Sequence, residues 1–345
     1  MRLGDVLVNL LKEKCVERIY TPIRLESRNP IQQIAVHVAN GKANICKAER
    51  ETRFSYTLDG RFVENVADAF AGKCDENVIL DGKELVREAE RGGFPYVIVD
   101  CSFFDLHSEK ERSRLKVQLK AILGVIRDFM WDAKLVITGK GMSSITSNLS
   151  SNTIFYSNTA EFIKENSIKN IILLDPNAEK VFTGEKAECY IIGGIVDKSG
   201  NKKGLTGRIG DMLEKEGIEF ESMRIELRGD VVGVPDRINA VAEIVLLSVL
   251  DGLAIEEAIK KVQSPLVARW RLKKELPKIS KRVDGRKVFR FVKKSDFKRF
   301  DWLNVTFKDF LEVCRQLDFL VLSDNLSAEI EKLDFDPVKK RYIFR

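Results

Sequence analysis

Between about residues 94 and 268 the sequence alternates short apolar runs with amphipathic segments, and this alternation limits the possible folds more than any other feature. The apolar runs have the length of buried strands, and the segments between or after them have helical periodicity. Strands alternating with helices at this spacing predict an α/β domain built on a parallel sheet. The predicted strands cover 96–102, 135–138, 153–156, 170–174, 189–196 and 222–227, and the predicted helices cover 108–131, 159–166, 207–216, 236–250 and 255–262.

The region before this domain has a different pattern. Residues 1–14 read as a short amphipathic helix. Asn40-Gly41 lies between β-prone runs at 31–39 and 42–47, and Asp59-Gly60 lies between runs at 53–58 and 61–63. Both pairs favour tight hairpin turns, because Gly accepts the positive φ that such turns need. We therefore predict a small N-terminal α+β domain at 1–85, followed by a charged linker at 81–93.

The region after the α/β domain is basic. A hairpin is predicted around Asp284-Gly285 within 281–291, and helices are predicted at 306–317 and 327–333. The predicted organisation is thus an α+β domain at 1–85, an α/β domain at 94–268 and a basic α+β domain at 269–345.

Several classes of protein are poorly supported. No apolar run is long enough for a membrane span, and 1–14 lacks a signal-peptide cleavage site, so a cytoplasmic location is expected. The six cysteines form no Cys-x-x-Cys pair and the chain has two histidines, so no metal site is predicted. Free, buried thiols in a reducing compartment are the preferred interpretation.

The positive charge is concentrated in one region. The chain carries a net charge of +6, but between Arg269 and Arg299 there are fourteen Lys or Arg residues and only three acids. Such a concentration is typical of a surface that binds a phosphate backbone. A solvated basic face without a partner remains the alternative.

Common nucleotide and hydrolase motifs are missing. The run Thr138-Gly139-Lys140-Gly141 follows a predicted strand, but it lacks the spacing of a phosphate-binding loop. No strand ends in G-x-G-x-x-G, and there is no G-x-S-x-G. Nucleoside triphosphatase, dinucleotide-dependent and acyl-transfer chemistry therefore have little support.

Two segments carry candidate acids. In 189–206 a buried strand leads into Gly193-Gly194 and brings Asp197 to its carboxyl end, where parallel sheets bind ligands. Asp197 could equally be a turn residue. In 234–241, Asp236 stands where a helix N-cap is expected, a role worth about 1 kcal/mol.

These segments resemble a known family. The GGIVDK and KGLT elements within 189–206 look like the signature of the tRNA position-9 N1-purine methyltransferases of the SPOUT superfamily. Residues 96–103 with 115–118 are similar to that family's first strand and helix, and 222–227 with 235–239 are similar to its last strand and following helix. The resemblance covers about 94–268. The flanking regions resemble those of the longer archaeal members.

The resemblance implies a fold, an activity and a set of site residues. It implies an α/β SPOUT domain with a C-terminal trefoil knot, and methylation of N1 of the purine at tRNA position 9, guanosine or adenosine, with S-adenosyl-L-methionine. By motif position the catalytic candidates are Asp197 and Asp236. The candidates for cofactor binding are Leu174, Ile192, Gly193, Gly194, Gly204, Leu205, Leu227, Ile238 and Asn239.

The resemblance implies tRNA as the partner, with no membrane and no obligate protein partner. Members of the family typically act as monomers, so a monomer is expected. The candidates for RNA binding are Lys110, Arg114, Arg127, Lys202, Lys203, Arg208, Arg269 and Arg271. Two alternatives stay open at this point: a SPOUT methyltransferase that acts on another RNA site, and a non-enzymatic RNA-binding protein on the same scaffold.

Overall fold

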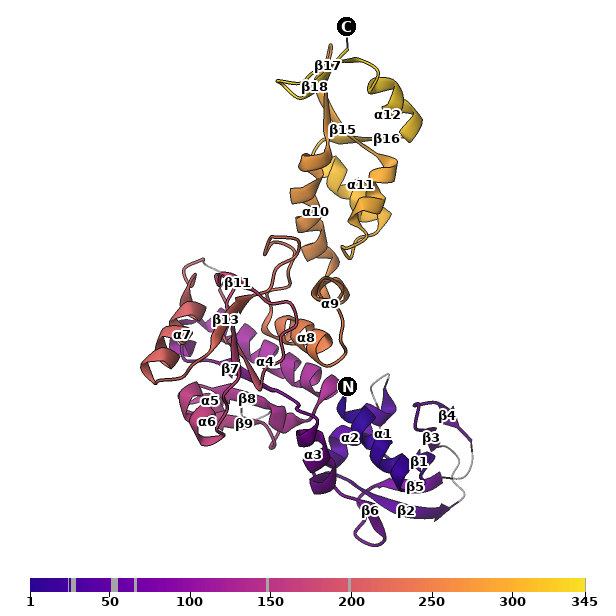
Figure 1. Cartoon of the computed structure of the whole chain (residues 1–345), viewed down its shortest axis with the longest axis vertical. Coiled ribbons are helices and arrows are strands. Elements are labelled where there is room, and N and C mark those ends of the chain that lie inside the picture. The colour runs from indigo at the N-terminus through magenta and orange to yellow at the C-terminus, as the bar shows by residue number, and fades with distance from the viewer. Residues whose placement is uncertain are drawn as a thin grey trace. The chain divides into compact units, whose positions relative to one another are not determined.

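A seven-stranded parallel sheet forms the centre of the α/β region (Figure 1). The computed structural model describes residues 1–23, 25, 29–50, 55–64, 67–146, 149–197 and 200–344. The chain forms two units, which are described separately: Met1–Ile225 with Arg237–Leu253, and Glu226–Asp236 with Ala254–Arg345.

The parallel sheet has the strand order β11-β13-β10-β12-β7-β8-β9, and every pairing in it is parallel. The predicted α/β class with a parallel sheet is therefore confirmed. Its strands are β7 (Tyr96–Asp100), β8 (Leu135–Thr138), β9 (Ile154–Tyr156), β10 (Ile171–Leu174), β11 (Lys180–Val181), β12 (Cys189–Gly193) and β13 (Glu221–Arg224).

Both faces of this sheet are covered. On one face, Ile98 and Ile191 pack with Phe162 of α6 (Thr159–Glu165) and with Leu213 of α7 (Leu205–Lys215). The neighbouring Val97 and Val99 of β7 are buried as well, although successive strand residues point to opposite faces. This explains why the strands read as continuous apolar runs.

The helices α4 (Glu109–Phe129) and α8 (Ile238–Val249) pack on each other, and α8 lies against β12. The sequence dictates where α4 begins. Ser108 and Glu111 form a capping box, in which the Ser108 N–H and hydroxyl both donate to the Glu111 carboxylate. Smaller helical pieces border the sheet: η1 (Phe104–Leu106), η2 (Asp132–Lys134) and α5 (Met142–Ile145).

The N-terminal region forms a six-stranded sheet in the order β4-β3-β1-β5-β2-β6. The predicted hairpin at Asp59-Gly60 is confirmed by the antiparallel pairing of β3 with β4, although 53 and 54 lie outside the described residues. Its elements are α1 (Leu3–Glu13), β1 (Arg18–Tyr20), α2 (Pro30–Ala39), β2 (Asn44–Arg50), β3 (Ser55–Thr57), β4 (Phe62–Val63), β5 (Ala67–Gly72) and β6 (Val78–Leu80).

The predicted hairpin at Asn40-Gly41 is wrong, because its first arm is the helix α2. The Asn29 side chain accepts from the Gln32 N–H, and Pro30 occupies the first turn, so the start carries the usual helix signals. Its buried apolar residues recur at helical spacing. Gly41, at φ +68°, follows the last turn and takes the left-handed conformation common after helices.

The predicted linker at 81–93 is also wrong, since most of it forms α3 (Gly82–Arg91). Asp81 caps this helix by accepting from the Glu84 N–H, while Leu85 and Ala89 are buried. Gly92 and Gly93 then end the helix, with Gly93 at φ +73°. The charged residues that indicated a linker form the exposed side of this helix.

The expectation of free thiols fails for one pair. Cys46 in β2 forms a disulfide with Cys74, which follows β5. Because β2 and β5 pair antiparallel, with Asn44 opposite Gly72, the two cysteines lie at the same end of the ladder. Cys101, Cys189 and Cys314 are free and buried, as expected, and Cys15 is free but exposed.

Polar contacts fasten the N-terminal region to the α/β region within the first unit. Arg2 donates two hydrogen bonds to the Asp251 carboxylate, at 2.9 and 2.6 Å, and its guanidinium lies over the Phe129 ring. Gln32 accepts from the Gly4 N–H and donates to the Arg127 carbonyl. Except for the Gly4–Gln32 hydrogen bond, these contacts join residues that are 95 to 249 positions apart in the sequence.

The second unit contains a five-stranded sheet in the order β16-β15-β14-β18-β17. The antiparallel pairing of β14 with β15 confirms the hairpin predicted at Asp284-Gly285. The last predicted helix, 327–333, instead spans 324–330, because Ser323 caps it. Its elements are α9 (Ile255–Val262), α10 (Pro265–Ile279), β14 (Lys281–Asp284), β15 (Phe289–Lys293), η3 (Lys294–Phe300), α11 (Phe307–Gln316), β16 (Phe319–Leu322), α12 (Asp324–Ile330), β17 (Asp334–Asp336) and β18 (Arg341–Ile343).

Within the described ranges, no helix is long and apolar enough to cross a membrane. The same ranges contain no group of three or more His, Cys, Asp or Glu residues arranged to hold a metal ion.

Candidate functional site

The carboxyl ends of four neighbouring strands meet at one edge of the parallel sheet. Leu174 of β10 pairs with Ile192 of β12, Gly193 pairs with Asp100 of β7, and Asp100 pairs with Thr138 of β8. Open parallel sheets bind ligands at this edge. The register therefore brings the predicted cofactor residues Leu174, Ile192, Gly193 and Gly194 together there.

The turn after β12 needs glycine for a structural reason. The Gly194 N–H donates to the Asp100 carbonyl at 2.6 Å. A Cβ atom on Gly194 would lie 2.5 Å from the Cys101 sulfur, far closer than packing allows, and one on Gly193 would lie 3.0 Å from Ile195 Cδ1. Glycine thus lets the backbone of the turn run directly against the end of β7.

A buried polar network, which no sequence motif indicated, supports this edge. Asp100 is almost fully buried; its Oδ1 accepts from the Ser102 N–H and its Oδ2 from the Thr159 hydroxyl. The Thr159 and Thr138 hydroxyls are 2.6 Å apart. Buried polar groups of this kind fix a single arrangement once they are satisfied. In the sequence, the acid Asp100 at the end of an apolar run was the signal that could have indicated this network.

The Asp197 side chain is exposed, and both of its carboxylate oxygens accept backbone hydrogen bonds from the following loop. Oδ1 accepts from the Gly200 N–H at 2.8 Å and Oδ2 from the Lys202 N–H at 2.9 Å. The loop ends at Gly204, at φ +81°, and the buried Leu205 begins α7. Asp197 therefore organises its own loop, as the turn interpretation predicted.

Lys202 is turned inward. Its Nζ donates to both oxygens of Glu111, at 3.0 and 2.9 Å, and its side chain is only 8% exposed. Hydrogen bonds from Lys202 and from Ser108 lower the pKa of Glu111 to about 2. Its ammonium group is already used in a structural ion pair, which does not favour the predicted contact with RNA, and that contact stays a prediction.

The first turn of α8 carries two further predicted cofactor-binding residues, Ile238 and Asn239. The Ile238 N–H donates to Gln118 Oε1 of α4 at 2.9 Å, and Ile238 is buried while Asn239 is partly buried. The cap residue of α8 is Arg237, with no capping side chain. The expectation that Asp236 caps this helix is therefore wrong, and the part-buried Gln118–Ile238 hydrogen bond supplies a partner from another helix instead.

Among the remaining RNA-binding candidates of the first unit, Arg127 is less exposed than the others. Arg127 forms a two-point ion pair with the fully buried Asp132, so its guanidinium has a structural partner. The contact of Arg127 with a phosphate stays a prediction, since its side chain is 39% exposed. Arg208 is exposed and lies over the Phe103 ring. The exposed candidates are Lys110, Arg114, Lys203 and Arg208.

The second unit holds Leu227, Asp236, Arg269 and Arg271. Leu227 is fully buried and Asp236 is exposed. Arg271 is 2% exposed and forms an ion pair with Glu275 at 2.9 Å. Arg269 forms ion pairs with Asp309 and Glu312. This burial does not favour a phosphate contact, and the predicted RNA contact of Arg271 stays a prediction.

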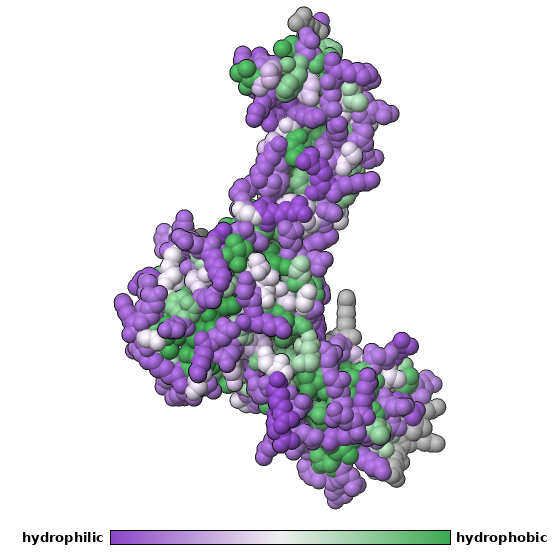
Figure 2. Space-filling view, viewed as in Figure 1, coloured by the Kyte–Doolittle hydropathy of each residue, from purple (hydrophilic) through white to green (hydrophobic). Residues whose placement is uncertain are grey.

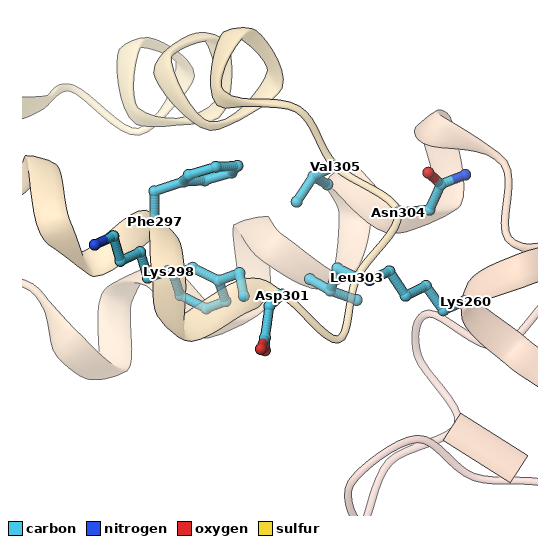
Figure 3. Close-up of a pocket in the computed structure, with 8 residues that line it drawn as sticks. Lys260, Phe297, Lys298, Asp301, Leu303, Asn304 and Val305 are labelled. Carbon is cyan, nitrogen blue, oxygen red and sulfur yellow. The ribbon is translucent and has the colours of Figure 1, made fainter. Parts of the chain in front are cut away.

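A hollow of about 450 Å³ lies within the second unit (Figure 3). Apolar side chains, among them Phe297 and Val305, form its walls, and lysines from two different elements border it. Asn304 is held beside it by Gln263, whose side-chain and backbone oxygens accept from the Asn304 N–H and Nδ2. The lining residues are Lys260, Phe297, Lys298, Phe300, Asp301, Leu303, Asn304 and Val305.

The parallel sheet, with a glycine turn and a loop that carries Asp197 at its carboxyl edge, defines an α/β protein of the kind that binds ligands at this edge. Comparison with known proteins is more specific. Residues 4–88 and 269–343 match the N domain and the C domain of tRNA (guanine(9)-/adenine(9)-N1)-methyltransferase, and residues 70–228 match tRNA (guanine(9)-N(1))-methyltransferase TRM10/TRM10A.

Individual relatives agree with these matches. The chain is 36% identical over 344 residues to the tRNA (guanine(9)-/adenine(9)-N1)-methyltransferase of Thermococcus kodakarensis, covering 96% of this chain and 92% of that protein. A dual-specific Trm10 from Thermococcus kodakaraensis superposes with a TM-score of 0.62 at 26% identity, covering 74% of this chain and 98% of the other. Sulfolobus acidocaldarius Trm10 in complex with S-adenosylhomocysteine has the same fold, with a TM-score of 0.64 at 21% identity over 92% of this chain and 99% of the other.

The chain belongs to the archaeal-type Trm10 family of tRNA (guanine(9)-/adenine(9)-N1)-methyltransferases. It is an enzyme that methylates N1 of the purine at position 9 of tRNA. The predicted family and reaction are confirmed, and so is the α/β class with a central parallel sheet and flanking α+β domains. The two alternatives, another RNA site and a non-enzymatic RNA-binding protein, are set aside.

Proposed function

We propose that Asp197 is the side chain that meets N1 of the purine, and that the turn after β12 together with the first turn of α8 holds the methyl donor beside it. The observation that carries this proposal is the pair of backbone hydrogen bonds that fixes the Asp197 carboxylate on the loop leaving the ligand edge. A group held in one orientation loses little freedom when the substrate arrives.

The residues around this edge fit S-adenosylmethionine chemically. Leu174, Ile192, Leu205 and Ile238 are buried apolar side chains suited to an adenine ring. Gly193, Gly194 and Gly204 leave backbone atoms close to the edge, and Asn239 offers an amide. When bound, the donor supplies a methyl group on a cationic sulfur. For Leu227 and Asp236 the proposal rests on motif position alone.

The two purines place different demands on an acid. N1 of guanosine carries a proton and must lose it before N1 can attack the methyl carbon, so we assign acceptance of this proton to the Asp197 carboxylate. N1 of adenosine already has a lone pair, and there Asp197 would only orient the base. Asp197 thus acts as a base in one reaction and as an orienting group in the other.

We also propose that the C-terminal half of the α/β domain forms the trefoil knot expected from the family resemblance. The strand order supports this, since β13 pairs with β10 although β12 lies between them in the sequence. A crystal structure that traces 222–227 through the loop after β12 is the expected result. An unthreaded path would contradict it.

For tRNA binding, the exposed cations without acidic partners are the strongest candidates. In the second unit many cations are already paired, including Lys274 with Asp230 and Lys281 with Glu331. Over the part of the chain that the structure describes, six exposed cations of the basic region have no ion-pair partner. Arg290 donates to the Ser280 hydroxyl and Lys294 lies over the Phe307 ring. The other four are Lys273, Arg286, Lys287 and Lys298. We propose that these residues contact phosphates, with Lys110, Arg114, Lys203 and Arg208 on the first unit.

The surface and the hollow of the second unit support this role. In the face seen in Figure 2, hydrophilic side chains cover most of the region around α10 and the strands that follow. The hollow combines the aromatic Phe297 with Lys260 and Lys298. This combination suits a nucleotide, with the base against the ring and the phosphate near a lysine. We propose that it receives an unpaired nucleotide of the tRNA.

Nucleoside mapping tests the proposed reaction. Two matched tRNAs with guanosine or adenosine at position 9 are incubated with the enzyme and S-adenosylmethionine, then digested and analysed by mass spectrometry. We expect N1-methylguanosine or N1-methyladenosine at position 9, made by a monomeric enzyme. Methylation confined to another position would overturn the assignment. The oligomeric state is measured by light scattering in the same buffer.

A further inference from the structure

The Glu111 carboxylate is hydrogen-bonded to two segments of the chain: the start of α4 and the loop that contains Lys202. It accepts from the Ser108 N–H and hydroxyl at the start of α4, at 2.9 and 2.8 Å, and from Lys202, which lies 91 residues further along the chain. The Glu111 and Lys202 side chains are 6% and 8% exposed. A loop lysine normally extends its ammonium group into water. Here that group is held against the first turn of α4.

Lys202 also contacts Asp197 through its backbone. Its N–H donates to Asp197 Oδ2 while its side chain donates to Glu111. One residue therefore connects the start of α4 to the carboxylate that we assign to the purine. Charge-assisted hydrogen bonds are stronger than neutral ones, so this connection is firm.

His107 holds the other side of the same loop. Its ring is buried, with Nε2 2.9 Å from the Val196 nitrogen and Nδ1 3.1 Å from the Phe104 carbonyl. A backbone N–H can only donate and a carbonyl can only accept, so this geometry assigns a neutral ring with its proton on Nδ1. Val196 directly precedes Asp197, so His107 fixes the chain where it enters the loop.

We infer that His107, Glu111 and Lys202 form a clamp that sets the orientation of Asp197 for methyl transfer. These three are positioning residues: each acts through the loop and none needs to touch the substrate. The inference rests on the proposed role of Asp197. It also gives Lys202 and its neighbour Lys203, which is exposed, opposite functions, although the sequence analysis treated them alike.

The experiment compares K202M with K203M in the full-length enzyme. Single-turnover methylation of tRNA with guanosine at position 9 is measured at saturating tRNA, and tRNA affinity is measured separately. We expect K202M to slow the saturating rate at least tenfold while the tRNA Kd changes less than twofold. K203M, which removes a proposed phosphate contact, should weaken tRNA binding, and its loss of saturating rate should be smaller than that of K202M.

His107 provides an independent arm with a conservative variant. Gln at position 107 keeps a side-chain oxygen that can accept from the Val196 N–H, whereas Leu does not. We expect H107Q to retain most of the rate and H107L to lose at least tenfold, with S-adenosylmethionine binding by calorimetry confirming that both are folded. Equal rates for these two variants would contradict the role of His107.

Asp197 variants separate failure of the clamp from failure of the proposed function. D197N should be slow, and adding K202M to it should cause little further loss, because both changes affect the same group. If D197N is slow while K202M and H107L keep the wild-type rate, the clamp alone is overturned. If D197N keeps the wild-type rate, the role of Asp197 fails, and the clamp fails with it. A K202M variant that loses affinity but not rate would restore Lys202 as a phosphate contact.

Discussion

Arg127 and Asp132 form an ion pair through two hydrogen bonds: Nε to Oδ1 and Nη2 to Oδ2, both 2.7 Å long. The Asp132 carboxylate is fully buried, and the Asp132 N–H donates to Asn40 Oδ1 of the N-terminal region. The Asn40 carbonyl accepts from Asn152 Nδ2. This pair therefore lies where the N-terminal region and the α/β region meet in the first unit.

Removing Arg127 should destabilise the protein. In R127M a buried carboxylate loses its ion-pair partner, which typically costs about 3 kcal/mol. We expect a clear fall in Tm by differential scanning fluorimetry. R91M is the matched control, because Arg91 and Glu88 form an exposed ion pair of the kind that contributes little. Equal Tm values for R127M and R91M would contradict this account.

The same pair should make stability depend on pH. Burial by itself would raise the pKa of Asp132, but hydrogen bonds from Arg127, Ser150 and Asn40 outweigh it and hold that pKa below its ordinary value. A depressed pKa means that the stabilisation is present above the pKa of an unfolded Asp and is lost as pH falls through the lower folded value. The Tm difference between wild type and R127M should therefore shrink below about pH 4.

The Cys46–Cys74 disulfide should raise stability. It closes a loop of 28 residues, and restricting such a loop in the unfolded chain is worth about 3–4 kcal/mol in the chain-entropy view. We expect dithiothreitol to lower the Tm of the wild type and to leave that of C46S/C74S unchanged. Mass measurement after thiol alkylation gives the oxidation state in each sample. A Tm that ignores the reductant although alkylation shows reduced Cys46 and Cys74 would contradict the prediction.

The α/β fold could be predicted because its strands and helices differ in period and length. Buried strands such as β7 and β12 read as continuous apolar runs, and α4 carries a capping box at Ser108. The N-terminal region was harder. Asn40-Gly41 fits a hairpin turn and a helix end equally well, and only the helical spacing of the preceding buried residues distinguishes them.

The site could be predicted only in part, for a related reason. Local motifs located Gly193, Gly194 and Asp197, but partners of buried charges are far away in sequence. Nothing near Lys202 indicates that its ammonium group binds Glu111, 91 positions earlier. Arg127 and Arg271 likewise counted as surface charges until the fold gave them structural partners. Composition gives the number of cations in a segment, whereas their availability depends on tertiary structure.

Substituting Asp197 should affect the two purines differently. In D197N the side chain keeps its shape but can no longer take the N1 proton, which only guanosine must lose. We expect D197N to slow guanosine methylation by at least tenfold more than adenosine methylation. Single-turnover rates near pH 7 on tRNAs that differ only at position 9 measure this. Equal losses on both tRNAs would leave Asp197 as an orienting group only.

Exposed cations without acidic partners should carry tRNA binding in the second unit. The triple variant K273M/K287M/K298M removes three exposed cations for which the described part of the chain shows no acidic partner. The control K278M/R299M/K332M removes the same charge from positions whose cations are paired with Glu275, Asp296 and Glu329. Because each lost phosphate contact reduces the salt dependence of binding by about one, the first variant should bind more weakly and with a slope lower by about three.

The control should keep most of the wild-type affinity and slope, since its cations are already partly neutralised within the protein. Fluorescence anisotropy of labelled tRNA at several salt concentrations measures both quantities. Adding F297L to the first variant should weaken binding further without changing the slope, because an aromatic ring contacts a base and releases no counterion. If both triple variants weaken binding equally, net charge alone attracts the tRNA, and the exposed cations have no special position on its backbone.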